Sequence, residues 1–152
     1  MPSAPELADE LKQRWKGLPE EALLRIALAI LDRMVRTNLV ECFTRANRHD
    51  WAARLTALPE IADHDTLKTA EAMVTAATRG VAPPGEADMN AFTAGLVVLT
   101  KIHGWAHQQG GTKYFLRRVS LSGFIVARIA GVDDRDEMNA QRSAVQAQEA
   151  AS

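Results

Sequence analysis

Two histidines stand four residues apart in this chain, His103 and His107, a spacing that places both imidazoles on one face of a helix. Both could therefore reach the same metal ion. Zinc needs a third or fourth ligand, and the neighbouring sequence offers no carboxylate to supply one. We expect His103 to lie at the edge of the core and His107 to face solvent. The sequence predicts no cofactor, and a metal-dependent enzyme using His103 and His107 is the third-ranked hypothesis for function.

Two His-Asp dipeptides, His49-Asp50 and His64-Asp65, also carry side chains that can bind metal. Each lies just before a segment with helical periodicity, where an aspartate side chain can accept a hydrogen bond from the first turn. Such a cap is worth about 1 kcal/mol and explains the placement without catalysis. We expect Asp50 to cap one short helix, and Asp63 or Asp65 to cap the next.

A long stretch of the chain contains no carboxylate. Residues 89–132 hold no aspartate or glutamate, although the whole chain is nearly neutral, with a formal net charge of -1. The same stretch contains Lys101, Lys113, Arg117, Arg118 and Arg128. Clustered cations can contact an acidic protein or phosphates, and exposed aromatic rings beside them can stack on bases. The candidate binding surface comprises Lys101, Trp105, His107, Lys113, Tyr114, Arg117 and Arg118.

Several partners are compatible with this surface. A small non-enzymatic binding, adaptor or regulatory protein is the first hypothesis, with a protein partner or self-association preferred. Binding of DNA or RNA is the alternative. Residues 126–132 resemble the first helix and turn of helix-turn-helix repressors, but the four carboxylates among residues 133–137 would repel the duplex. The identity of the partner and the oligomeric state stay open, as does docking of the acidic tail onto residues 113–118.

Hydrophobic periodicity predicts an all-α fold: a single-domain bundle of about five to seven helices around a long central helix. Apolar residues recur at helical spacing from Ala22 to Phe43, with a kink or break expected between Arg36 and Phe43. Two later segments should pack against it. Their expected core stripes include Phe92, Leu96, Leu99 and His103 in the first, and Leu121, Phe124, Ile125 and Ile129 in the second. Residues 112–121 suit helix or strand, with helix favoured.

Length and composition indicate one domain, since 152 residues with 47% hydrophobic side chains suffice for a single core. We assign residues 1–132 to the bundle and expect residues 133–152, rich in Ala, Gln and acids, to be a frayed helix or disordered. The single cysteine, Cys42, excludes an intrachain disulfide. The sequence shows no signal peptide and no apolar run that could span a bilayer, so we expect a cytoplasmic protein without membrane contact.

Overall fold

The computed structural model describes residues 4–81, 85–107 and 111–151. Within these ranges the side chains of Ala4, Pro5, Ala8, Ala106 and His107 are not described. All regular secondary structure in the described residues is helical, which confirms the predicted all-α bundle. None of the helices searched among the described residues is long and apolar enough to cross a membrane.

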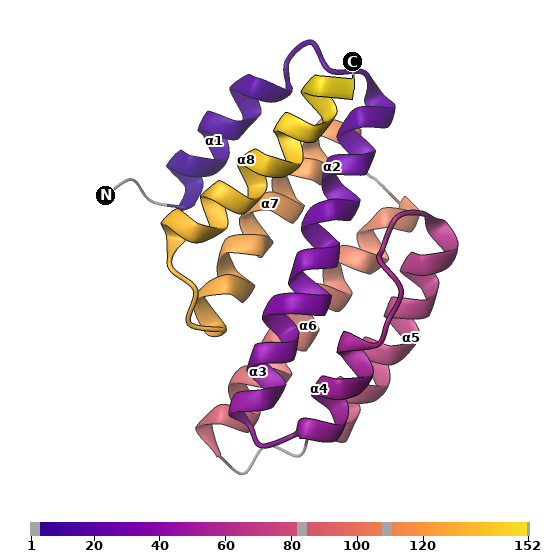
Figure 1. Ribbon diagram of the computed structural model, residues 1–152, viewed down its shortest axis with the longest axis vertical. Coiled ribbons are helices and arrows are strands. Elements are labelled where there is room, and N and C mark those ends of the chain that lie inside the picture. Colours follow the sequence, from indigo (N-terminus) through magenta and orange to yellow (C-terminus); the bar gives the residue numbers. More distant parts are fainter. Residues whose placement is uncertain (1–3, 82–84, 108–110, 152) are drawn as a thin grey trace.

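The helices follow one another through short connections. They are α1 (Ala4–Trp15), α2 (Glu20–Arg33), the π-helix η1 (Met34–Leu39), α3 (Val40–Arg45), α4 (His49–Thr56), α5 (His64–Gly80), α6 (Glu86–His107), α7 (Thr112–Ile129) and α8 (Asp134–Ala151). In Figure 1, α1, α8 and α2 form the front of the bundle, and α7 and α6 lie behind them. Helices α4 and α5 flank α6 and α3. Residues 112–121, compatible with helix or strand in sequence, form the first part of α7.

The helical path from Glu20 to Arg45 runs through α2, η1 and α3 without an intervening turn. The π-helix spans residues 34–39 and so overlaps the region where a kink was expected. Buried side chains occur along the whole path, from Leu23 through Leu31 and Leu39 to Phe43. These side chains contribute to one core cluster with α1, α5, α6, α7 and α8.

Helix α5 has the local start signal that its sequence predicts. The Asp63 carboxylate accepts a hydrogen bond from the Thr66 backbone N–H at 2.9 Å, and the Thr66 hydroxyl accepts one from the Asp63 N–H at 3.0 Å. This reciprocal capping box stabilises the first turn. The expected cap by Asp50 is wrong. Helix α4 already begins at His49, so Asp50 lies inside the first turn, where a carboxylate interacts favourably with the helix dipole.

Residues 134–151, expected to be frayed or disordered, form the regular helix α8 in the structure. It packs against α1, α2 and α7. Its few apolar side chains, Met138 and Val145, are buried, and the polar Glu137 and Gln141 are buried with them. The segment therefore has a packed inner face although its composition is polar.

Buried polar groups of α8 are paired with partners on α2 and α7. The Glu137 carboxylate accepts a hydrogen bond from Arg33 Nε at 3.0 Å. Gln141 Nε2 donates to the Ser120 carbonyl at 3.0 Å, and the Ser120 hydroxyl donates to Gln141 Oε1 at 2.5 Å. A cavity of about 20 Å³ beside Arg33, Glu137 and Gln141 has room for one water molecule. Burial of polar side chains is tolerated because they are hydrogen-bonded.

Helices α5 and α6 approach closely at Gly95. A Cβ atom at this position would lie 2.2 Å from the Thr78 hydroxyl oxygen. Gly95→Ala should therefore lower the free energy of unfolding by about 2 kcal/mol, because the overlap outweighs the higher helix propensity of alanine. Urea denaturation followed by circular dichroism measures the change.

Gly104 provides the matched control on the same helix. A Cβ atom there would lie 3.4 Å from the Phe115 ring, an ordinary contact, so Gly104→Ala should leave stability unchanged or raise it by up to about 1 kcal/mol. Adding Thr78→Ala to Gly95→Ala should recover most of the loss. A Gly95→Ala protein as stable as the wild type would contradict the described packing of α5 on α6.

Candidate binding surface on helices α6 and α7

In the folded protein, basic side chains of the carboxylate-free stretch, residues 89–132, form ion pairs with acids from other segments. Arg117 forms an ion pair with Asp9 of α1. Arg128 donates two hydrogen bonds to Asp134, at 2.8 and 2.6 Å, which hold the pKa of the Asp134 carboxyl below its usual value. Two of the basic side chains that the sequence groups together are thus neutralised in the folded molecule.

Three cations of the stretch, Lys101, Lys113 and Arg118, have no carboxylate within 4 Å among the described residues. Lys101 is half-buried, and desolvation together with the nearby Arg118 lowers the pKa of its amine. The Arg118 guanidinium lies 5.7 Å from the centre of the Tyr114 ring, within the range of a cation–π contact. Tyr114 itself is 51% exposed.

The remaining aromatic and imidazole candidates have different environments. Trp105 is half-buried against the core, and its ring lies edge-to-face with Phe115 at 5.9 Å between ring centres, so only part of the indole is exposed. His103 is exposed and its Nε2 lies 3.6 Å from a Glu71 carboxylate oxygen. The side chain of His107 lies outside the described residues. Among the described side chains no group of three His, Cys, Asp or Glu residues could hold a metal ion.

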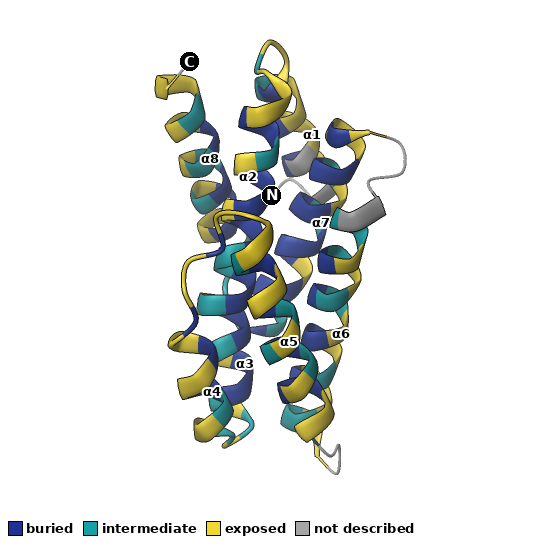
Figure 2. Ribbon diagram, turned by 90° about the vertical axis from the view of Figure 1, so that its right-hand side faces the viewer, coloured by how far each residue is buried: buried dark blue, intermediate teal, exposed yellow. Residues whose placement is uncertain are grey.

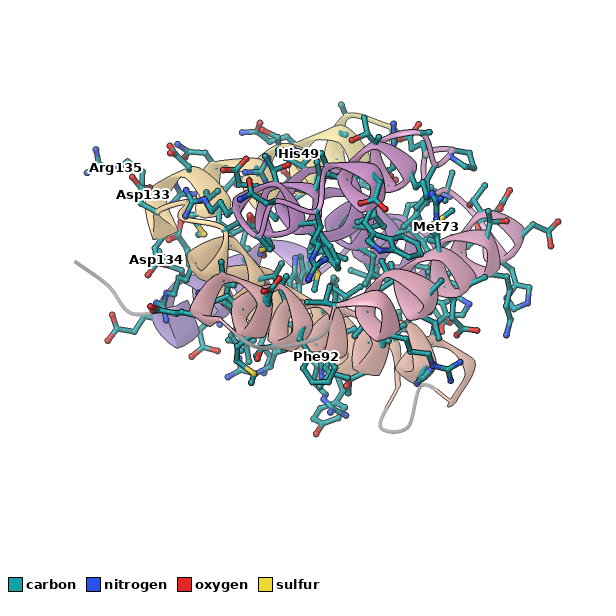
Figure 3. All side chains as sticks on the ribbon, turned by 90° about the horizontal axis from the view of Figure 1, so that it is seen from below. His49, Met73, Phe92, Asp133, Asp134 and Arg135 are labelled. Atoms are coloured by element: carbon teal, nitrogen blue, oxygen red, sulfur yellow. The ribbon has the colours of Figure 1, made fainter. Side chains whose placement is uncertain are left out.

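A second feature coincides with the stretch: large apolar side chains that point into solvent. Those more than a third exposed among the described residues are Met89, Leu96, Tyr114 and Ile125, all on α6 or α7. Phe92 and Leu121 beside them are half-buried. Figure 3 shows Phe92 on the outer side of α6, pointing away from the bundle. We call the surface formed by Met89, Phe92, Leu96, Tyr114, Arg118, Leu121 and Ile125 the α6/α7 face.

The α6/α7 face is contiguous because the two helices pack against each other in opposite directions. Gly104 near the end of α6 lies beside Phe115 near the start of α7, and Asn90 and Ile129 line the same pocket at the other end. On α7, Tyr114, Arg118, Leu121 and Ile125 recur every three or four residues, which places them in one row. In Figure 2, α6 and α7 lie at the right edge of the bundle with no further helix outside them.

The expected orientation of α6 is wrong. Leu96, expected in the core, is 45% exposed, and His103, expected at the edge of the core, is exposed as well. The side chain that faces inward near the middle of the helix is Val98. The buried row consists mostly of small residues: Ala91, Ala94, Gly95, Val98 and Ile102. Small side chains allow α6 to approach its neighbours, and the larger apolar ones are left outside. Ile125 of α7, likewise expected in the core, is 46% exposed.

Cys42, Ser120 and Ser122 are poorly suited to act as nucleophiles because all three are buried. Cys42 lines an open pocket of about 300 Å³ with Arg45 and Glu86, but burial raises the pKa of its thiol to about 12. The thiol is therefore protonated at neutral pH, and the thiolate is the reactive form. Ser120 and Ser122 are buried.

Comparisons of this chain with protein-family models, with curated proteins and with solved structures find no match.

Proposed function

We propose that this protein is a small non-enzymatic binding protein, of the adaptor or regulatory class, that contacts a partner protein through the α6/α7 face. One observation carries the proposal: the large apolar side chains exposed among the described residues, Met89, Leu96, Tyr114 and Ile125, all lie on this face. Single exposed apolar residues are common on monomers, whereas a contiguous exposed group is typical of interaction sites.

The charges on and around the face also favour a protein partner. Lys101, Lys113 and Arg118 lie near one end of the face. The first turn of α6 at the other end carries Glu86, which is exposed, and Asp88, which is ion-paired with Arg48. A surface with an apolar centre and polar ends has the composition of a protein–protein interface. The exposed tyrosine adds to this, because tyrosine is enriched at such interfaces.

Nucleic-acid binding is the second candidate, supported by the grouping of Lys101 and Arg118 with exposed Tyr114. Ion pairing of Arg117 and Arg128 reduces the cations available for phosphates. Three cations would give weak binding that decreases as the salt concentration rises. An apolar face of this kind has no role in contacting a phosphate backbone, so we rank this candidate below protein binding.

Site-specific photocrosslinking in the cells that produce the protein tests the proposal. A benzophenone-bearing residue at position 96 should give a discrete protein adduct on irradiation, because Leu96 lies at the centre of the α6/α7 face. The same residue at position 146 is the control, since Gln146 is exposed on α8. An adduct of position 96 that nuclease removes would instead favour nucleic-acid binding. Equal crosslinking from both positions, or none from position 96, would contradict the proposal.

A further inference from the structure

We infer that the partner seated on the α6/α7 face is a second copy of this chain, related by a two-fold axis perpendicular to α6. This inference rests on the proposed function, because it names the occupant of the same face. In the resulting dimer, α6 of one copy lies antiparallel to α6 of the other, and the two α7 helices are paired in the same way.

Three apolar side chains of the face, Leu96, Leu121 and Ile125, are arranged symmetrically about its middle. Gly104 lies beside Phe115, and Asn90 and Ile129 line one pocket, which sets the register of α6 against α7. Leu96, near the midpoint of α6, therefore lies at about the level of Leu121 and Ile125 on α7. An axis at this level places Leu96 opposite its own copy and Leu121 opposite Ile125. A closed two-fold interface requires such self-complementarity.

Charge determines the direction of the pairing. Lys101, Lys113 and Arg118 lie near the end of α6 and the start of α7. The exposed acids Glu86 and Asp133 lie at the opposite end, where Asp134 neutralises Arg128. A two-fold axis parallel to the helices would place the basic end of one copy against the basic end of the other. An axis perpendicular to them brings Glu86 of one copy to the level of Lys113 of the other. The perpendicular axis therefore gives complementary potentials and the parallel axis gives repulsion.

The face is also large enough for a dimer. Helix α6 has 22 residues and so a length of roughly 33 Å. Two packed helices present a width of roughly 20 Å, which gives on the order of 650 Å² per copy and 1,300 Å² in total. This lies at the lower end of the range for specific protein–protein interfaces, about 1,200–2,000 Å².

Sedimentation equilibrium of the purified full chain tests the inference. The wild type should have twice the monomer mass of 16.6 kDa at micromolar concentration. Leu96→Glu places two carboxylates opposite each other at the axis, and Ile125→Glu places one opposite Leu121. Each should weaken dimerisation at least about tenfold. Gln146→Glu on α8 is the control and should leave the mass unchanged.

Charge exchange tests the orientation of the two copies. Glu86→Lys alone and Lys113→Glu alone each place like charges opposite one another and should weaken the dimer. An equimolar mixture of the two variants should restore dimers, because every pair in the mixed dimer is then of opposite sign. The double variant, with both changes in one chain, should dimerise like the wild type. Circular dichroism confirms that each variant is folded, so that a loss of mass reports association.

The outcomes separate this inference from the proposed function. A folded wild type with the monomer mass at all accessible concentrations overturns the inference, as does a dimer that Leu96→Glu leaves intact. If that monomer still gives a heterologous protein adduct from position 96 in cells, the proposed function stands and its partner is another protein. If the wild type forms dimers but the mixture of the Glu86→Lys and Lys113→Glu variants does not, the antiparallel arrangement is overturned.

Discussion

Arg33→Met should lower the free energy of unfolding by about 3 kcal/mol at neutral pH, because it leaves the fully buried Glu137 carboxylate without its cation. In the wild type, Arg33 Nε lies 3.0 Å from Glu137 Oε2. Arg33 is 31% exposed, so part of the effect is screened by solvent and the expected loss is at the low end for buried ion pairs. Urea denaturation of the variant measures it.

The loss should depend on pH in a defined direction. Desolvation raises the pKa of Glu137 in the folded protein, and Arg33 opposes this rise. A carboxyl with a raised folded pKa contributes stability that is fully present below its unfolded pKa and is lost as the pH rises through the folded value. Removing Arg33 raises the folded pKa further. Arg33→Met should therefore cost less near pH 4.5 than at pH 7.

Two further variants test whether the charge pair is responsible. Arg142→Met removes an ion pair to Glu10 whose side chains are 36% and 49% exposed, and it should cost at most about 1 kcal/mol. Replacing both members of the buried pair, as Arg33→Met with Glu137→Leu, should recover most of the stability, since no charge is then left unpaired. A double variant as unstable as Arg33→Met alone would show that packing of Arg33, and not its charge, stabilises α8.

The Phe124→Ala variant should lose about 3–5 kcal/mol, because Phe124 is fully buried on α7, which packs extensively against α2. For a domain with a total stability of about 5–15 kcal/mol this is a large fraction. The melting temperature should fall by roughly 10 °C, measured by circular dichroism.

Gln146→Ala provides the comparison for Phe124→Ala, because Gln146 is exposed on α8 and its truncation should change stability by less than about 0.5 kcal/mol. If Phe124→Ala unfolded at the same temperature as this control, the inner face of α7 could not be the one described. The result also bears on function, since the inner face of α7 positions the outer residues Arg118, Leu121 and Ile125.

Local signals in the sequence were sufficient for much of the fold. The spacing of apolar residues predicts helices, and the capping box of Asp63 and Thr66 depends on residues three apart, so it is visible without tertiary contacts. The helices expected on both sides of residues 112–121 favour helix there as well. These features depend on short-range geometry, which the sequence encodes directly.

The inward face of α6 could not be read from hydrophobicity. Alanine and glycine score as weakly apolar, so the row of Ala91, Ala94 and Gly95 is less conspicuous than the row containing Phe92 and Leu96. Close packing against α5 selects the small residues for the interior, and that contact involves Thr78, which is far away in sequence. The same reason explains why Leu96 was missed as a candidate surface residue. The available signal for the inward face of α6 was its row of small residues beside a row of large apolar ones.

The C-terminal segment illustrates the same limit for polar residues. Its composition favours solvent exposure, yet Glu137 and Gln141 are buried because Arg33 and Ser120, at positions distant in sequence, supply their hydrogen bonds. Gly123 of α7 provides the space, since a Cβ there would lie 2.8 Å from Gln141 Nε2. Complementary partners on three helices cannot be inferred from any one of them.

By itself, the sequence determined the helical class of the fold and the location of a basic stretch without carboxylates between residues 89 and 132. Tertiary structure decided which of those cations are free, because Asp9 and Asp134 neutralise Arg117 and Arg128 while Lys101, Lys113 and Arg118 have no such partner among the described residues. It also decided that apolar side chains accompany the free cations on one face. The physical reason is that helix formation depends on neighbours within a few residues, whereas ion pairing and burial depend on which helices the fold brings into contact.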